Sequence, residues 1–156
     1  MKETEYYLFW YLLTHEGYTA NKWGEKTNSF LRRRGIYQVY GRHSVHGLEA
    51  LLYIGSAADR TLAERLDEQY RDWIKEEQQI LFRIGHLTER DSERIIENSS
   101  DILDAEAALI QYCTPCYNTK SKVKEEMKPG IRIFNAGEYG ALPTEISWRW
   151  WTWGKW

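Results

Sequence analysis

The stretch GIYQVYGRHSVHGLEALLYIG, residues 35–55, contains two short motifs, Gly35-Ile36-Tyr37 and Tyr53-Ile54-Gly55. Residues 36–40 and 50–54 are rich in β-branched, aromatic and aliphatic side chains, which favour strands. The connection between them holds two glycines and two histidines and predicts a long hairpin loop. A glycine next to each strand is typical of close approach by a neighbouring strand or a phosphate.

Beyond these motifs, the apolar pattern predicts further helices and strands. Apolar residues at helical spacing predict an amphipathic helix over residues 61–77. Residues 79–87 alternate between the two faces of a third strand, and a second main helix should open at Ser100 and end before Pro115. The expected fold is therefore α+β, with a small three-stranded antiparallel sheet flanked by helices.

The segments outside this pattern give three more expectations. Residues 4–14 are apolar nearly all round a helical wheel, which predicts a buried N-terminal helix. Thr88, with Asp91 three residues later, predicts the cap of a short helix through Ile96. Residues 131–134 predict an extra strand.

Length and composition favour one folded domain. The chain has 156 residues, of which 42% are hydrophobic and 15% aromatic, enough for one sizeable core and too few for two comfortable domains. We expect a single domain over residues 1–156, with a core at about 35–118, an N-terminal extension at 1–34 and a Trp-rich C-terminal extension at 119–156. The net charge of −2 argues mildly against bulk electrostatic coating of nucleic acid.

The sequence predicts an intracellular, cytoplasmic protein that does not use the membrane. No apolar run approaches the roughly 20 residues that a membrane span needs. Glu3 and Glu5 precede the aromatic stretch at the N-terminus, and no small-residue cleavage site follows it, so the stretch does not resemble a secretory signal. Both cysteines are expected to be reduced.

Glu106 is the strongest candidate functional residue that periodicity identifies. It comes four residues after Ile102 and three before Leu109, so it shares the apolar face of the second main helix. A buried carboxylate normally has a cation, a metal ion or several hydrogen-bond donors as partner. The alternative to a functional site is a structural ion pair, for instance with Arg65.

The two tripeptides, followed in order by Arg65, Glu106 and Asn118, resemble the core of the GIY-YIG nuclease family. The resemblance covers residues 35–118. It implies the GIY-YIG fold and a divalent-metal-dependent endonuclease, a phosphodiester hydrolase, with DNA as the expected partner and RNA as the alternative. The oligomeric state stays open.

The resemblance also implies a role for each catalytic residue. Glu106 would bind Mg²⁺ or Mn²⁺, and Arg65 would bind the phosphate, because a guanidinium stays charged and can bond two phosphoryl oxygens. Tyr37 and Tyr53 would orient or activate the attacking water and contact the phosphate, and Asn118 would support the site. The alternatives are a surface arginine, two core tyrosines and a turn asparagine.

One position departs from the family pattern. One turn after Arg65, where many members have a histidine or tyrosine that assists proton transfer, this chain has Gln69. His43, His46 or Tyr40 could replace it from another direction, so the identity of the general base stays open.

Basic residues lie beside the motifs. The expected nucleic-acid-binding residues are Arg33, Arg34, Arg42, Lys120 and Lys122. The alternative is scattered, solvated charge.

The two cysteines and two of the histidines have a spacing that zinc sites use. Cys113 and Cys116 form a CxxC motif, and His43 with His46 forms HxxH. Together they could form a four-ligand zinc site, but two small, buried cysteines are the default interpretation, since the two pairs lie far apart in the sequence and Cys113 fits the apolar stripe of its helix.

The tail over residues 147–156 mixes tryptophan with positive charge and is a candidate strand. Such a run either covers an apolar face or a subunit interface, or stacks on single-stranded bases. It supports the alternative function, a non-cleaving module that binds nucleic acid or a protein partner through this tail.

Overall fold

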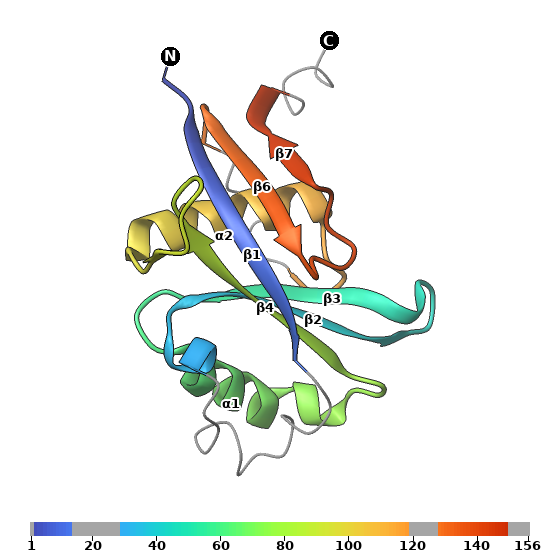
Figure 1. Ribbon diagram of the computed structural model, residues 1–156. Coiled ribbons are helices and arrows are strands. Elements are labelled where there is room, and N and C mark those ends of the chain that lie inside the picture. The colour runs from blue at the N-terminus through green and yellow to red at the C-terminus, as the bar shows by residue number, and fades with distance from the viewer. Residues whose placement is uncertain (1, 14–28, 119–127, 150–156) are drawn as a thin grey trace.

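The computed structural model describes residues 2–13, 29–118 and 128–149, which form a mixed α+β fold around one strongly twisted sheet (Figure 1). In chain order its elements are β1 (Thr4–Leu13), η2 (Ser29–Arg32), β2 (Gly35–His43), β3 (Gly47–Ala57), α1 (Leu62–Asp72), η3 (Ile74–Glu76), β4 (Leu81–Thr88), β5 (Ile95–Ile96), α2 (Ser99–Cys113), β6 (Ile131–Gly137) and β7 (Glu145–Ser147).

The prediction of a small three-stranded antiparallel sheet is wrong. The described residues form a seven-stranded sheet with the order β3-β2-β4-β1-β6-β7, and β5 pairs with β4. The three expected strands are neighbours in it, but β1 continues the sheet beyond β4 and pairs in parallel with β6. In Figure 1 the β2–β3 hairpin runs across the direction of β1 and β6. The sheet is larger because both ends of the chain contribute strands to it.

The predicted N-terminal helix is a strand, β1. Tyr6, Leu8 and Trp10 are buried on one face, while Leu13 and the partly buried Tyr11 pack on the other. A continuous apolar run is compatible with a buried helix or with a strand covered on both faces, and periodicity alone does not separate them. β1 has hydrogen-bonded strands on both sides and contributes side chains to the core on both faces, although Phe9 and Leu12 are exposed.

The predicted short helix after Thr88 is also wrong. Asp91 has a positive φ of 53°, and the amide of Glu89 donates to the carbonyl of Arg94, so the segment is a turn. The chain returns along β4 as β5, with Leu87 opposite Ile96. Local backbone pairing therefore replaces the helix that the Thr–Asp spacing indicated.

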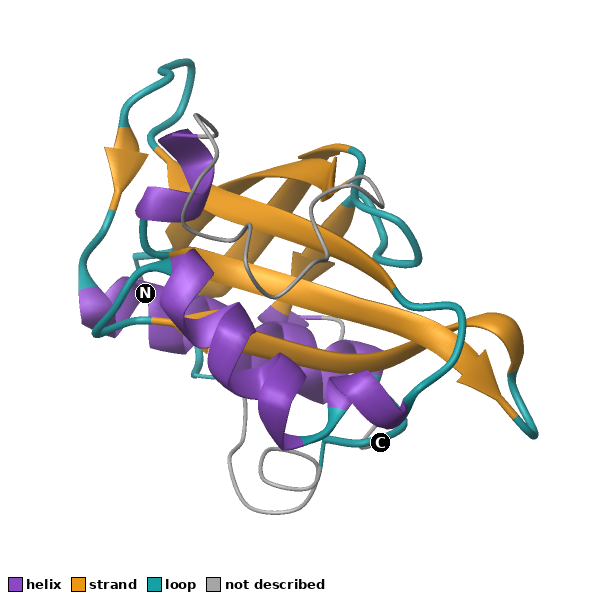
Figure 2. Ribbon diagram, turned by 90° about the horizontal axis from the view of Figure 1, so that it is seen from below, coloured by secondary structure: helices purple, strands orange, loops and turns teal. Residues whose placement is uncertain are grey.

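The main helices of the described residues cover opposite faces of the sheet. Neighbouring residues of a strand point to opposite faces, and Ile36 belongs to a core cluster with Ile102 of α2, while Tyr37 belongs to a second cluster with Leu66 of α1. Figure 2 shows α1 in front of the long strands. Both helices therefore reach β3, which forms one edge of the sheet.

Four predicted elements match elements of the structure. The strands predicted at residues 36–40, 50–54 and 79–87 correspond to β2, β3 and β4, and the helix predicted at 61–77 corresponds to α1 followed by η3. The hairpin loop is shorter than expected, because β2 extends to His43 and β3 begins at Gly47. The second main helix begins at Ser99, with Asn98 rather than Ser100 as its cap. No helix among the described residues is long and apolar enough to cross a membrane.

The C-terminal extension completes the sheet. The strand predicted at residues 131–134 is confirmed as β6, and β7 pairs with it. Of the candidate strand over residues 147–156, Ser147 ends β7 and Trp148 packs partly buried against the cluster that contains Trp10. Residues 150–156 lie outside the described part of the chain.

Candidate active site

A cleft of about 650 Å³ opens at the β3 edge of the sheet, between the two main helices. Tyr53, Arg65, Glu106 and Asn118 all line it. These residues come from β3, α1, α2 and the segment after α2. The structure thus brings together four of the five expected catalytic side chains, although they are spread over more than sixty positions of the chain.

Glu106 lies at the border of the apolar face of α2, half-buried rather than fully buried. Ala105 and Leu109 pack into the core beside it. Its Oε2 accepts a hydrogen bond of 2.6 Å from Ser56 Oγ, the residue directly after the second tripeptide. The carboxylate is therefore held against the end of β3 and faces the cleft.

Arg65 lies on the opposite wall of the cleft, on α1. Its helix is capped by Thr61, whose side chain accepts from the amide of Glu64. Arg65 Nη1 lies 3.0 Å from Oε1 of Glu68, and the same carboxylate also pairs with Arg60. Glu68 thus holds two guanidinium groups at the cleft, opposite Glu106.

Tyr37 lies directly behind the cleft, next to Tyr53. Their ring centroids are 6.1 Å apart. Tyr37 pairs with Gly55 in the β2–β3 register, and a Cβ at Gly55 would lie 2.3 Å from the Tyr37 hydroxyl. The second motif glycine is therefore needed so that the Tyr37 side chain can reach across β3.

The hydroxyl of Tyr37 is fully buried and makes no hydrogen bond of good geometry within the described ranges, although Arg65 and the Tyr53 hydroxyl lie close enough to interact with it. Burial raises the pKa of Tyr37 well above its ordinary value, and the Arg65 charge offsets this only in part. Burial also raises the pKa of Tyr53, with Glu106 adding to the effect. Both tyrosines are therefore protonated at neutral pH and can donate a hydrogen bond.

Gly35, the first motif glycine, has a structural role. A Cβ at this position would lie 2.3 Å from the carbonyl oxygen of Gly85 on the adjacent strand β4. The side chain of Leu62 lies 3.2 Å away on the other side. The glycine lets β2, β4 and the start of α1 pack closely.

Asn118 fixes the segment after α2 to β3. Its Oδ1 accepts from the Ile54 amide at 2.9 Å, and its Nδ2 donates to the Ile54 carbonyl at 2.8 Å. The amides of Cys116 and Tyr117 donate to the Leu51 and Leu52 carbonyls. The segment thus covers the outer edge of the sheet, and the polar support expected of Asn118 is a pair of backbone hydrogen bonds.

Gln69 and the three residues that could replace it in proton transfer, namely His43, His46 and Tyr40, do not line the cleft. Gln69 is buried and accepts a 2.7 Å hydrogen bond from Trp73 Nε1. The Tyr40 hydroxyl donates to Gln38 and accepts from the Ala141 amide. His43 and His46 are at the tip of the β2–β3 hairpin, and none of these residues is among those that line the cleft.

The expected nucleic-acid-binding residues are only partly described. Arg33 is exposed and lies 3.4 Å from Glu97, and the backbone amide of Arg34 donates to the same carboxylate. Arg42 is exposed near the hairpin tip. Lys120 and Lys122 lie outside the described residues.

Four polar or charged cleft residues were missed by the sequence analysis, namely Ser56, Asp59, Arg60 and Ser99. Ser56 could have been found from its place after the Tyr53-Ile54-Gly55 tripeptide. Arg60 lies in the connection between β3 and α1, and Ser99 is the first residue of α2, one position before the predicted helix start, so neither carries a periodic signal. Comparison of the chain with protein-family models, with curated proteins and with solved structures found no match.

Proposed function

We propose that this protein is a divalent-metal-dependent endonuclease that hydrolyses DNA phosphodiester bonds with one metal ion. The observation that supports the proposal most directly is the cleft that collects Tyr53, Arg65, Glu106 and Asn118. Tyr37 lies immediately behind it. These are the residues to which the GIY-YIG resemblance assigns catalytic roles.

The charges of the cleft suit a phosphodiester. Arg65 and Arg60 place two cations on the α1 side, where Asp59 pairs with Arg60 at 3.3 Å, and Glu106 places a carboxylate on the α2 side. A guanidinium has five N–H donors, so the ion pair that Arg65 makes with Glu68 leaves it able to bond a phosphoryl oxygen. Arg65 would therefore hold and neutralise the phosphate in the cleft.

The donor set around Glu106 suits a hard cation. Mg²⁺ prefers oxygen ligands, keeps several waters and is often bound through one or two carboxylates together with substrate phosphate. Glu106 provides a half-buried carboxylate whose Oε2 is oriented by Ser56. Mg²⁺ or Mn²⁺ bound by Glu106 would stabilise negative charge on the phosphoryl and leaving oxygens.

The tyrosines would act as hydrogen-bond donors. Because burial raises the pKa of Tyr37 and of Tyr53, neither hydroxyl is a ready base at neutral pH. A protonated hydroxyl can donate to a phosphoryl oxygen and orient the attacking water. The Tyr53 hydroxyl lines the cleft and could donate directly, whereas the Tyr37 hydroxyl is buried behind it and would act through its neighbours Tyr53 and Arg65.

The remaining polar residues would serve binding. Asn118 would keep the cleft wall in place through its two hydrogen bonds to Ile54. Arg33, Arg34 and Arg42 would contact the nucleic-acid backbone, and weaker binding at higher salt would reveal such contacts.

The decisive experiment is a cleavage assay on supercoiled, linear, branched and single-stranded DNA, and on RNA, with Mg²⁺ or Mn²⁺. Glu106→Gln should lower the cleavage rate by about 100-fold or more while leaving the fold intact. Glu49→Gln is the matched control, because it makes the same chemical change at an exposed carboxylate. Glu49 lies on the edge strand β3 and is not among the cleft residues.

A second matched pair tests the phosphate site. Arg65→Ala should lower cleavage strongly, whereas Arg71→Ala, on the same helix but paired with Asp67, should not. Cleavage by Glu106→Gln at the wild-type rate would refute the proposal. Salt-dependent DNA binding with no cleavage under either metal would instead favour the non-cleaving module.

A further inference from the structure

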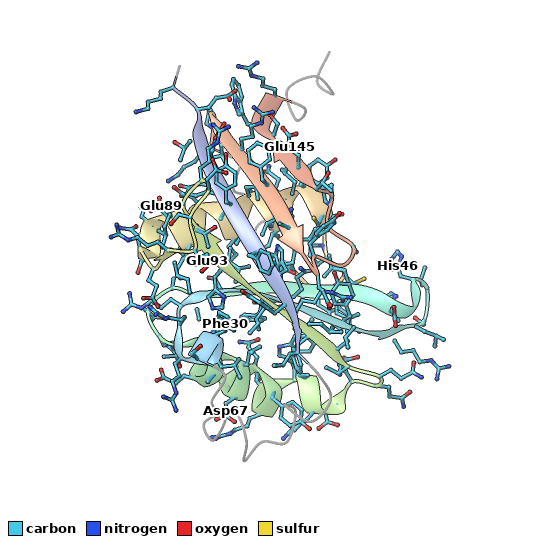
Figure 3. All side chains as sticks on the ribbon, viewed as in Figure 1. Phe30, His46, Asp67, Glu89, Glu93 and Glu145 are labelled. Atoms are coloured by element: carbon cyan, nitrogen blue, oxygen red, sulfur yellow. The ribbon has the colours of Figure 1, made fainter. Side chains whose placement is uncertain are left out.

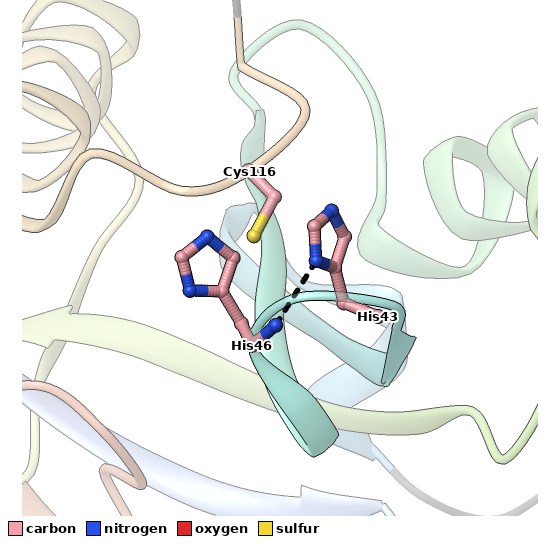
Figure 4. Close-up of side chains that lie close together, drawn as sticks. All are labelled: His43, His46 and Cys116. Carbon is pink, nitrogen blue, oxygen red and sulfur yellow. Dashed lines mark hydrogen bonds between the residues drawn. The ribbon is translucent and has the colours of Figure 1, made fainter.

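A cluster of two histidines and a cysteine lies outside the cleft, at the tip of the β2–β3 hairpin. The possible metal-ligating atoms of His43, His46 and Cys116 all lie within 4.8 Å of one another. Figure 4 shows the Cys116 sulfur directed toward the space between the two imidazole rings. In Figure 3, His46 is at the outer end of the hairpin, on the side of the molecule opposite Glu89.

The backbone of two separate segments positions this cluster. A register irregularity between Gly41 and His43, and a positive φ of 96° at Gly47, shape the hairpin so that His43 pairs with Gly47. Cys116 comes from the segment after α2 and is fixed beside β3 by its amide hydrogen bond to the Leu51 carbonyl at 3.2 Å. The ligand atoms are thus brought together by parts of the chain that are already held in place.

The residue types select a different class of metal from the one that Glu106 suits. Zinc binds thiolate and imidazole ligands, whereas Mg²⁺ prefers oxygen. In a tetrahedral zinc site with bonds of about 2.0–2.3 Å, ligand atoms lie about 3.3–3.8 Å apart. The ligand atoms lie within 4.8 Å of one another, so closing each pair by at most about 1.5 Å would form the site.

Cys113 does not belong to the cluster. The sequence placed both cysteines in one CxxC motif, but Cys113 packs against the apolar core that contains Trp10 and Ile110. Burial raises the pKa of its thiol to about 12. The structure therefore separates the two cysteines into one core residue and one cluster residue.

We propose that His43, His46 and Cys116 bind one zinc-class transition-metal ion, with a water molecule as the fourth ligand. The ion would join the hairpin to the segment that carries Asn118. It would thereby hold the outer edge of the sheet next to the cleft, as a structural ion distinct from the one expected at Glu106.

Binding requires one local exchange at His43. Its Nδ1 accepts hydrogen bonds from the amides of Val45 and His46, both at 3.2 Å, at the long end of the usual range. Metal binding by this imidazole would replace these two bonds. The ring centroid of Tyr117 lies 6.0 Å from that of His43, so this aromatic side chain is next to the cluster.

The test uses the full chain, reduced and freed of metal, with zinc chloride or cobalt chloride as the probe. We expect about one equivalent of bound zinc after dialysis, and a thiolate-to-cobalt charge-transfer band together with the visible bands of tetrahedral cobalt. Cys116→Ala should lose the charge-transfer band, and His43→Ala or His46→Ala should weaken zinc binding by at least tenfold. Cys113→Ala is the matched control and should bind as the wild type does.

The melting temperature gives a second measurement that does not depend on nuclease activity. Zinc should raise the melting temperature of the wild type and of Cys113→Ala, and should leave that of Cys116→Ala unchanged. The proposal is overturned if the wild type retains no zinc, if Cys116→Ala binds it equally well, or if Cys113→Ala loses it. Zinc retained without a rise in melting temperature would overturn the structural role.

Discussion

Tyr37→Phe should make the protein more stable and less active. The substitution removes a hydroxyl that is fully buried and makes no hydrogen bond of good geometry among the described residues, although the Arg65 guanidinium and the Tyr53 hydroxyl lie near it. An unsatisfied buried polar group costs about 1–3 kcal/mol, so we expect the free energy of unfolding to rise by about 2 kcal/mol. For a protein of this size, that corresponds to a rise of about 4–8 °C in melting temperature.

Tyr40→Phe is the matched control, because it makes the same change on the same strand at a hydroxyl that has partners. The Tyr40 side chain is buried, its hydroxyl donates to Gln38, and it accepts from the Ala141 amide at 2.9 Å. Its removal leaves both partners unsatisfied, so we expect a loss of about 2 kcal/mol in stability. The two variants should therefore shift stability in opposite directions.

Urea unfolding at neutral pH measures both variants, and the cleavage assay measures the accompanying change in rate. If Tyr37→Phe is destabilised as much as Tyr40→Phe, the buried hydroxyl has a favourable partner and the reasoning is wrong. A stabilised Tyr37→Phe that cleaves DNA at the wild-type rate would refute the catalytic role but not the structural argument.

Three further outcomes follow from the same site. Asn118→Ala should lower stability by about 2–4 kcal/mol, because it removes both hydrogen bonds to Ile54; faster hydrogen exchange at the Ile54 amide would show the loss, and unchanged exchange would contradict it. Gly55→Ala should lower the free energy of unfolding by about 1–3 kcal/mol in urea, since its Cβ would meet the Tyr37 hydroxyl. This loss should be smaller in a Tyr37→Ala background, and an equal loss in both backgrounds would exclude the clash. Because burial raises the pKa of Tyr37, the unfolded state loses this proton at a lower pH than the folded state. Above about pH 10, the free energy of unfolding should therefore fall by about 1.4 kcal/mol per pH unit for this group. Tyr37→Phe should show a shallower decline of this free energy in urea unfolding, and an identical slope would argue against the pKa shift.

The sequence located the elements whose patterns are local. The strand-favouring composition around Tyr37 and the helical stripe through Leu66 predicted a strand and a helix, because each signal lies within a few neighbouring residues. Glu106 was found in the same way, and the structure places it half-buried at the cleft rather than deep in the core.

Long-range pairing explains what the sequence did not reveal. β1 pairs with β4 and β6 at its two edges and has apolar side chains on both faces. A continuous apolar run of this kind does not distinguish a buried strand from a buried helix. The predicted sheet was too small for the same reason, because the pairing of β1 with β4 and β6 was not foreseen. The CxxC spacing also did not distinguish Cys113 from Cys116. In the fold, Cys113 packs partly buried against the core, whereas Cys116 lies beside the two histidines of the hairpin.

The detail of the site depends on side-chain directions that spacing does not define. The isolation of the Tyr37 hydroxyl and its approach to Gly55 follow from how the ring lies across β3. The Glu106–Ser56 hydrogen bond joins α2 to the end of β3, which are far apart in the sequence. Such contacts become visible only when the elements are assembled.

The parallel pairing of β1 with β6 sets Thr4 opposite Ile131, so the first strand of the chain meets one of its two neighbours near the other end of the sequence. Contacts between such distant segments slow folding, because a long loop must close before they form. During synthesis, β1 would leave the ribosome before β4 and β6, so its backbone edges stay unpaired beside apolar side chains, which is a site for association between unfinished chains. Production of this protein should therefore benefit from slow synthesis at low temperature, and deletion of residues 1–13 should expose β4 and lower the soluble yield.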